Sequence, residues 1–499
     1  MAPPAAEQPG PTLFPVRIKT LPDLTTPLQP DSSDAQGSSA SSPRRLPRAL
    51  ACLVMAVPVG LAFWFIHSFG VNVPFADSWN GTLPSVKALV GGHLSFALLW
   101  LPHNENRMLF PNLIQALVDS HTRVNSLDDM YLSAVVMTIS VLLLIWLAVR
   151  TTGISLVWMV PVPFLFFSLV QVGNLLWAFQ LAWMLILLCT IVCLWGLEAS
   201  RGRALPFVLA CLVGVVASYS SLQGLLVWPV GLTYALGRGL SRAQLAFWCL
   251  LAVVTTAFYE WHIGNIYTVG SPTFALAHPV LALRYFLQLM GGIVPAHHTT
   301  FALLMLGTSA LVGWGLTRHQ LARARLRRGA EAVDEEKAGG LYGRQVPLAR
   351  LRLPLALWLS GILFDVMVTI GRLQLNAPES SRYTTYNLVF LIGLYLGVAT
   401  LLSPPAGWRK LAALRDRPWR AALTAVVLAA VVVQIGWAIP SGLHQGHQTQ
   451  VSRSQAALLL REYRAEPNAA LATALFPPSG AYVKVWARWL QAKHWSVFS

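Results

Sequence analysis

The sequence predicts an all-α polytopic membrane protein, a transmembrane helix bundle of about 11 spans with a large external first loop that contains interfacial helices. Three observations support this fold class. Only 11% of the 499 residues are charged, whereas a soluble chain carries about 25%. Several apolar runs reach the roughly 18 to 20 residues that a helix needs to cross a bilayer. Basic residues gather in short segments between those runs.

The spans follow in chain order from hydropathy and flanking charge. They are predicted near 49–69, 130–149, 153–170, 175–197, 204–219, 222–237, 244–261, 299–317, 353–371, 384–403 and 420–438. Together they form a transmembrane domain, 48–440, which includes an external loop at 70–129 and a cytoplasmic basic loop at 318–352. A mixed external segment lies at 262–297.

Both ends of the chain differ in composition from the spans. Residues 1–47 are rich in Pro, Ser, Ala, Asp and Gln and lack apolar periodicity, which predicts a disordered cytoplasmic tail. This polar stretch is too long for a signal peptide. Residues 441–499 are predicted to form an external C-terminal tail, with a helical stretch near 451–465 and a tryptophan-rich end that suits the bilayer interface.

The orientation follows from the positive-inside rule. Most basic residues between spans fall in the predicted inside segments: Arg150, Arg201, Arg203, Arg238, Arg242, the run from Arg318 to Arg328 and the run from Arg409 to Arg420. The outside segments carry few, namely Lys87, Arg107, Arg123, Arg284, Arg372 and Arg382. The N-terminus is therefore predicted to be cytoplasmic and the C-terminus external.

The net charge of +16 does not indicate a nucleic-acid-binding protein. Such a protein collects its basic residues with stacking aromatics on a soluble face, whereas here they flank apolar runs, so we expect the lipid bilayer and no nucleic acid as a partner. All five cysteines lie in apolar segments and are typical of small buried side chains. Cys189 and Cys193 have helical spacing, but no further Cys or His lies near them to complete a metal site.

Polar residues collect on the predicted outer side. Asp77 follows the first span, where a carboxylate can take up a proton or bind a divalent cation, or can be an ordinary loop or cap residue. The stretch His103-Asn104-Glu105-Asn106-Arg107 has three interpretations. His103 and Glu105 could ligate a metal ion, Glu105 and Arg107 could form a surface ion pair, or residues 104–107 could hydrogen-bond a polyhydroxylated substrate, which we favour.

Further candidates flank the later spans. Asn174 and Gln180 are amides near the membrane boundary, suited to interhelical hydrogen bonds or to contact with a sugar. Arg372 and Arg382, the latter followed by Tyr383, lie at the outer boundary. A guanidinium there can bind phosphate through two parallel hydrogen bonds, or it can anchor the helix at the interface. Asp365 lies about two turns inside its span, and Gln223 in an outer turn.

The first loop with Asp77 just after the first span resembles the GT-C class of polytopic glycosyltransferases. The chain is also similar to a group of uncharacterised bacterial multi-spanning membrane proteins. The stretches that carry these likenesses are Asp77-Ser78-Trp79-Asn80, His103–Arg107, Asn174–Gln180, and Gly371-Arg372 with Ser381-Arg382-Tyr383. The resemblance implies lipid-phosphate-linked sugar donors, an active site on the external side and, for this chain, a place in the bacterial inner (plasma) membrane.

The resemblance also implies roles for residues. Asp77 would act as a base or lie next to a metal ion. Many members carry two acids at this place, whereas Ser78 and Trp79 follow Asp77 here, so Glu105 would supply the second acid from across the loop. A divalent cation, Mg²⁺ or Mn²⁺, is the cofactor that such a pair of acids would hold.

The leading hypothesis is transfer of a hexosyl or pentosyl group from a polyprenyl-phosphate sugar to an envelope glycan or lipid. Asp77 would deprotonate the acceptor hydroxyl, and Arg382, with Arg372, would hold the phosphate. One alternative is a transporter or flippase of a lipid-linked glycan, which predicts charged residues buried in the spans and internal repeats. Another is a membrane scaffold whose outer loops bind a partner.

Overall fold

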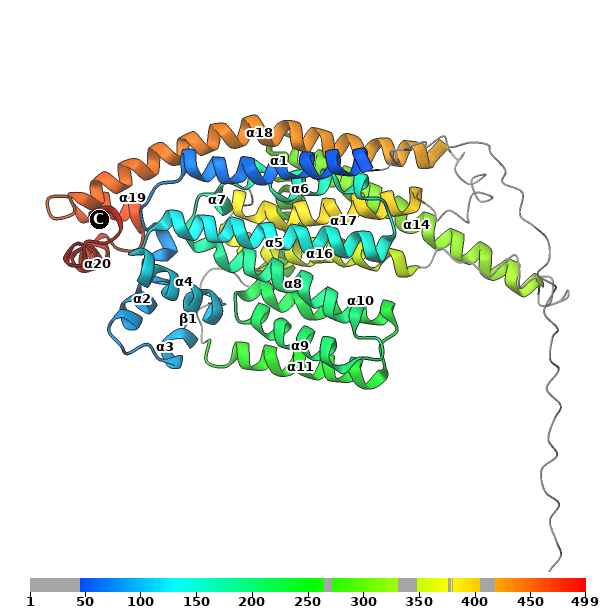
Figure 1. The fold of residues 1–499 in the computed structure, drawn as a ribbon, viewed down its shortest axis with the longest axis horizontal. Coiled ribbons are helices and arrows are strands. Elements are labelled where there is room, and N and C mark those ends of the chain that lie inside the picture. Colours follow the sequence, from blue (N-terminus) through cyan, green and yellow to red (C-terminus); the bar gives the residue numbers. More distant parts are fainter. Residues whose placement is uncertain (1–44, 264–271, 331–347, 376–377, 379, 404–417) are drawn as a thin grey trace, which may run out of the picture. The chain divides into compact units, whose positions relative to one another are not determined.

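The computed structural model describes residues 45–263, 272–330, 348–375, 378, 380–403 and 418–499 (Figure 1). The predicted disordered tail, 1–47, lies outside the described residues except for its last three, and so does the middle of the basic loop 318–352. Residues from Leu46 to Ser499 form one unit, and the fold of this unit follows.

Helices make up nearly all of the unit. Within the described residues the only strands are β1 (Pro102–His103) and β2 (Asn106–Arg107), which pair antiparallel. In the described part of the chain, eight helical segments are long and apolar enough to cross a bilayer: Arg48–Phe69, Ser126–Thr152, Leu156–Leu175, Ala178–Ala199, Arg242–Glu260, Ala349–Leu375, Ser381–Leu402 and Ala421–Arg461. Because helices satisfy their own backbone groups in lipid, the chain is an integral membrane protein built as an α-helical bundle.

The predicted number of 11 spans is not confirmed. The predicted spans 204–219, 222–237 and 299–317 are not among the eight segments. The first is α9 (Ala204–Ser218), which rises only about 22 Å against a hydrocarbon core of roughly 30 Å. The second divides into a 3₁₀ turn, η5 (Leu222–Leu226), and α10 (Val227–Arg238). The third falls within α14 (His298–Ala330).

The centre of the bundle is α17 (Thr384–Leu402), in which every residue from 384 to 400 is buried. It packs along α16 (Arg352–Arg372) at glycines: a Cβ on Gly361 would meet Phe390, and a Cβ on Gly393 would meet the backbone of Trp358. Small residues allow this close approach of helices in a bilayer. Figure 1 shows α5 (Ser126–Thr152) beside this pair, with α8 (Leu181–Ala199), α9, α10 and α11 (Arg242–Glu260) below.

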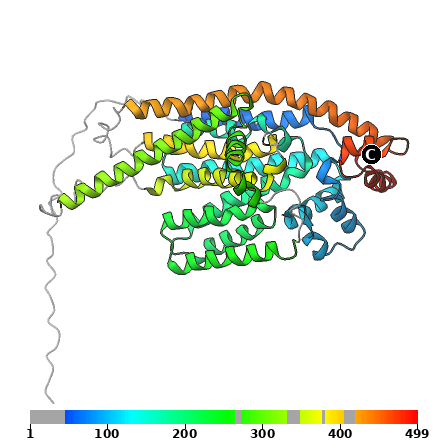
Figure 2. The same cartoon turned by 180° about the vertical axis from the view of Figure 1, so that it is seen from behind.

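The last of the eight long apolar segments lies in α18 (Pro418–Arg461), which differs from the prediction that ended the span at 438 and began a tail at 441. It continues through Pro440 (Figures 1 and 2). A Cβ on Gly446 would meet the Phe65 ring of α1 (Arg45–Phe69). Gln450 donates a hydrogen bond of 2.7 Å to a backbone carbonyl near the end of α1. These tertiary contacts keep a polar stretch helical, and local hydropathy does not register them.

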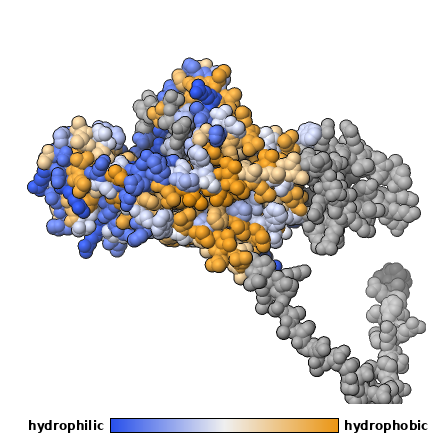
Figure 3. Space-filling model, turned by 90° about the horizontal axis from the view of Figure 1, so that it is seen from above, coloured by the Kyte–Doolittle hydropathy of each residue, from blue (hydrophilic) through white to orange (hydrophobic). Residues whose placement is uncertain are grey.

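At one end of the bundle lies a cap made from two distant parts of the chain. The first loop contributes α2 (Leu83–Val90), α3 (Phe96–Trp100) and α4 (Leu109–Thr122), and the C-terminus contributes α19 (Asn468–Leu475) and α20 (Gly480–Lys493). Trp79 and Val86 of the loop share one apolar core with Leu460, Trp486 and Leu490 of the C-terminal part. Figure 3 shows that this end is largely hydrophilic, whereas the flank of the bundle is hydrophobic.

A buried carboxyl pair lies where the cap joins the bundle. Asp119, in the last turn of α4, is 2% exposed, and Asp129, in the first turn of α5, is 3% exposed. Burial raises the pKa of Asp119 to about 7, and a hydrogen bond with Asp129 acts in the opposite direction. The C-terminus covers the turn between the two helices, because the amide of Ser496 donates to the carbonyl of Arg123 at 2.9 Å.

This pair predicts a pH dependence of stability. The pKa of Asp119 is 3.8 when exposed and about 7 in the fold, so between these values the folded state holds a proton that the unfolded state releases. The free energy of unfolding should therefore fall as the pH rises from about 4 to about 7. Asp119→Asn should flatten this slope, measured by unfolding of the purified protein in detergent across that range.

The matched control is Asp128→Asn, which removes a neighbouring carboxylate that is only partly buried. It should keep most of the slope, because burial of Asp119 is the larger cause of its raised pKa. An unchanged slope in Asp119→Asn would show that this carboxyl does not titrate in the range.

Candidate functional site

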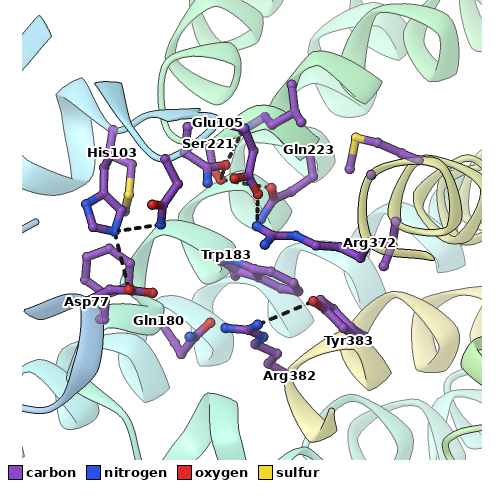
Figure 4. A pocket seen from close by; sticks show the side chains of 18 of the residues that line it. Asp77, His103, Glu105, Gln180, Trp183, Ser221, Gln223, Arg372, Arg382 and Tyr383 are labelled. Atoms are coloured by element: carbon purple, nitrogen blue, oxygen red, sulfur yellow. Dashed lines mark hydrogen bonds and ion pairs between the residues drawn. The ribbon is translucent and has the colours of Figure 1, made fainter. Parts of the chain in front are cut away.

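A pocket opens where the cap meets the bundle, and six stretches of the chain line it (Figure 4). The lining residues are Asp77, His103, Asn104, Glu105, Asn106, Met108, Trp177, Phe179, Gln180, Trp183, Ser221, Leu222, Gln223, Phe364, Met367, Val368, Gly371, Arg372, Arg382 and Tyr383. The space open to the centres of water-sized molecules is about 130 Å³. Nine of the predicted site residues therefore share one pocket: Asp77, His103, Asn104, Glu105, Asn106, Gln180, Arg372, Arg382 and Tyr383.

Asp77 lies in a 3₁₀ turn, η1 (Ala76–Ser78), directly after α1. The turn is held from the bundle side, because the indole of Trp177 donates to the carbonyl of Phe75 at 3.1 Å. His103 is the partner of Asp77: its Nε2 lies 3.6 Å from Oδ1 of the carboxylate. The His103 ring is 8% exposed and lies 5.3 Å from the ring of Phe179. Asp77 itself remains accessible from the pocket.

The hairpin of β1 and β2 carries Glu105 at its tip. Arg107, predicted as a substrate contact, does not line the pocket. It is 1% exposed and donates to the backbone carbonyls of Tyr259, Trp100 and Trp261. Arg107 thereby ties the hairpin to the end of α11.

The hairpin is also tied to η5. Asn106 accepts from the hydroxyl of Ser221 at 2.6 Å and from the amide of Leu222 at 3.1 Å. Glu105, at the tip between these anchors, forms an ion pair with Arg372 at the end of α16. This pair bridges the cap and the bundle across the pocket (Figure 4).

Arg382 lies in the 3₁₀ turn η9 (Ser381–Tyr383), which precedes α17. Asn174, another predicted contact that does not line the pocket, supports this turn from behind. Its amide donates to the carbonyl of Arg382 at 2.8 Å and to the hydroxyl of Thr385 at 2.7 Å. Asn174 is thus an interhelical hydrogen-bonding residue that positions Arg382.

The Arg382 guanidinium has aromatic neighbours. It lies 5.2 Å from the ring centre of Tyr383 and 5.9 Å from that of Trp177, and it donates to the Tyr383 hydroxyl at 3.4 Å. Within the described residues no carboxylate forms an ion pair with it, and its buried Nε has no hydrogen-bond partner. Aromatic faces stabilise a cation only partly, so this guanidinium can accept an anion.

The arrangement of carboxylates does not suit a shared metal ion. Among the residues that the structure describes, no three His, Cys, Asp or Glu side chains are placed to hold one. Glu105 is occupied by Arg372, and Asp77 adjoins His103. Neither carboxylate is oriented toward the other, so no step through Mg²⁺ or Mn²⁺ is derived.

Trp183 extends the set given by the sequence, whereas Gln223 and Asp365 were already named there. Trp183 lies in the first turn of α8 and lines the pocket, but inside a predicted span it had no distinguishing pattern; its only signal is a tryptophan near a membrane boundary. Gln223, in η5, also lines the pocket. Asp365 is fully buried in α16, and neither of its carboxyl oxygens has a hydrogen-bond partner within the described part of the chain.

Comparison with protein-family models, with curated proteins and with solved structures gives no match for this chain. The resemblance to the GT-C class therefore stays a prediction.

The support of η9 by Asn174 predicts a stability effect. Asn174→Ala should lower the free energy of unfolding by about 1 to 3 kcal/mol, because two buried acceptors lose their donor. Thermal unfolding in detergent measures the change. The control is Asn80→Ala, at an exposed asparagine, which should leave the unfolding temperature unchanged. Equal effects of the two variants would remove Asn174 as the support of Arg382.

Proposed function

We propose that this protein is a membrane glycosyltransferase that moves a sugar from a polyprenyl-phosphate donor to a hydroxyl of a cell-envelope acceptor. One observation carries the proposal: Asp77 and Arg382, which are far apart in the sequence, line one pocket. A general base and an anion-binding guanidinium are the two groups that such a transfer requires of the protein.

The proposed step is an inverting displacement. The acceptor hydroxyl gives its proton to the carboxylate of Asp77, and its oxygen forms a bond to the anomeric carbon of the sugar. The bond between that carbon and the phosphate oxygen breaks, and its electron pair leaves with the lipid phosphate. Arg382 stabilises the negative charge that grows on the leaving phosphate. Asp77 then releases its proton to water, and no strong acid is needed because phosphate is a good leaving group.

The other polar residues position these two. His103, with Nε2 at 3.6 Å from Asp77, orients the carboxylate. The ion pair between Glu105 and Arg372 holds the hairpin against α16 and so keeps the pocket walls together. Glu105 is accordingly a positioning group in this mechanism, in place of the second acid that the GT-C resemblance implies.

The distribution of charge supports a pocket on the external face. The opposite end of the bundle carries Glu198 with Arg238 and Arg352, at 3.2 and 3.1 Å. Arg350 there donates to the carbonyls at the ends of α5 and α17. Under the positive-inside rule this basic end faces the cytoplasm. The protein then lies in a bacterial plasma membrane. Its cap and C-terminus are on the external side, and its N-terminus is in the cytoplasm.

The test is transfer of labelled sugar from polyprenyl phosphate in proteoliposomes. Asp77→Asn should lower kcat by about 10² to 10⁴, the contribution of a general base. Arg382→Ala should lower kcat by about 10² to 10³, the contribution of one group that stabilises developing charge. Arg382→Lys should recover part of the loss, because it restores the charge without the planar fork.

The control carboxylate is Asp128, which hydrogen-bonds Asn125 and does not line the pocket. Asp128→Asn should transfer sugar at the wild-type rate. Wild-type rates in both Asp77→Asn and Arg382→Ala would refute the mechanism.

A second candidate, a transporter or flippase of a lipid-linked glycan, is favoured by Asp365. A fully buried carboxyl group without partners among the described residues is costly in a span and is therefore a functional candidate. Export of intact glycan without consumption of the lipid-linked sugar, abolished in Asp365→Asn and retained in Asp77→Asn, would select this function.

A further inference from the structure

The aromatic side chain of Trp183 lines the pocket and has no role in the proposed reaction. Trp183 is half-buried and is held by three rings. Tyr383 stacks on it at 6.0 Å with an interplanar angle of 29°, Phe364 packs edge-on at 5.5 Å, and Tyr386 packs edge-on at 6.1 Å. This packing fixes the indole, and the rest of the ring borders the pocket.

Two amides near this ring have unmet hydrogen bonds. Gln180 and Gln223 line the pocket and are 2% and 5% exposed. Within the described residues, Oε1 of Gln180 has no donor and Nε2 of Gln223 has no acceptor. The Ser221 hydroxyl, which donates its one hydrogen to Asn106 at 2.6 Å, lies 2.9 Å from Oε1 of Gln223. Buried polar groups are nearly always paired, so an unpaired acceptor and an unpaired donor indicate a ligand that can both donate and accept.

The charges around Trp183 are balanced. Figure 4 shows the ring between a layer with Gln223 and Arg372 and a layer with Gln180 and Arg382. Glu105 neutralises Arg372, and Arg382 is the guanidinium that the proposed function assigns to phosphate. No further cation of the pocket lining remains for a charged group on the sugar. A carboxylate at this place would have to share Arg382 with the phosphate or be buried without a partner, which is costly.

We infer that Trp183, Gln180 and Gln223 form a subsite for an uncharged sugar ring, which stacks its C–H face on the indole and shares its hydroxyls with the two amides. An aromatic wall with a few placed polar groups is the usual construction of a small-molecule site. A hydroxyl matches both amides, because it is a donor and an acceptor at once. The inference rests on the proposed function and adds the residues that select the sugar.

The experiment measures dissociation constants of three lipids for the full chain in nanodiscs. The probes are polyprenyl phosphate, polyprenyl-phosphate glucose and polyprenyl-phosphate glucuronic acid. In the wild type the glucose lipid should bind more tightly than the bare phosphate, and the glucuronic acid lipid should not. Trp183→Ala should lose about tenfold in affinity for the glucose lipid and leave the bare phosphate unchanged, a loss within the range of one aromatic contact.

Conservative and control variants separate recognition from folding. Trp183→Phe should retain most of the preference for the glucose lipid, because it keeps an aromatic face. Gln223→Met should reduce that preference without touching the Trp183 packing. The matched control is Trp64→Ala, at a tryptophan of α1 that is 48% exposed and far from the pocket lining, and it should bind all three lipids as the wild type does.

The outcomes distinguish this inference from the proposed function. Equal affinity of the wild type for glucose lipid and bare phosphate, or equal loss of both in Trp183→Ala and in Gln223→Met, would overturn the sugar subsite. Tighter binding of the glucuronic acid lipid than of the glucose lipid would overturn the inference that the subsite takes an uncharged sugar. Arg382→Ala should weaken the binding of all three lipids. If it does, Arg382 binds the phosphate whatever the result for Trp183→Ala. If it weakens the binding of none, the proposed function fails.

Discussion

Backbone polar groups inside a bilayer must find partners within the protein, and this constraint organises the pocket. Three stretches of the bundle break into short turns at the same level. They are the run from η3 (Leu169–Gln171) through α7 (Val172–Leu175) to η4 (Ala178–Gln180), the turn η5, and the two turns η8 (Leu373–Leu375) and η9. Each break frees amides and carbonyls, and each is tolerated because another stretch supplies the missing bonds.

Side chains from the breaks serve one another. The hydroxyl of Ser381 accepts from the amide of Gly173 at 3.0 Å, and Thr385 donates to Gln171 at 2.6 Å. The first loop joins this exchange, since Gln115 of α4 donates to the carbonyl of Ala178 at 2.9 Å. The polar residues around the pocket therefore have two roles. Asn174 and Arg107 donate hydrogen bonds to backbone carbonyls. These bonds hold Arg382 and Glu105 at fixed positions on the pocket wall.

The broad arrangement of the candidate site can be predicted from the sequence, but few of the contacts between its side chains can. Asp77 and Arg382 both follow or precede an apolar run on the side poor in basic residues, so charge distribution alone predicts that they lie on one face. The pairing of Glu105 with Arg372 needs the packing of the hairpin on α11, which depends on Arg107 and on no local pattern. Residues 441–461 have too polar a composition for a span, and the contacts with α1 that keep them helical are long-range. The cap core has the same origin: Trp486 has no feature that identifies Trp79 as its neighbour.

Under the proposed function, the ion pair between Glu105 and Arg372 determines which charges of the pocket remain available to a substrate. With that pair closed, the other charged groups of the lining are the carboxylate of Asp77, which adjoins His103, and the guanidinium of Arg382, and aromatic rings and amides make up much of the remaining lining. A displacement at an anomeric carbon requires the attacking oxygen and the leaving oxygen on opposite sides of the sugar. A base and an anion site carried by different elements, η1 and η9, can meet that requirement, whereas two charges on one turn would place acceptor and phosphate on the same side. The position of the base and the anion site on different elements is thus the feature that connects this fold to an inverting transfer.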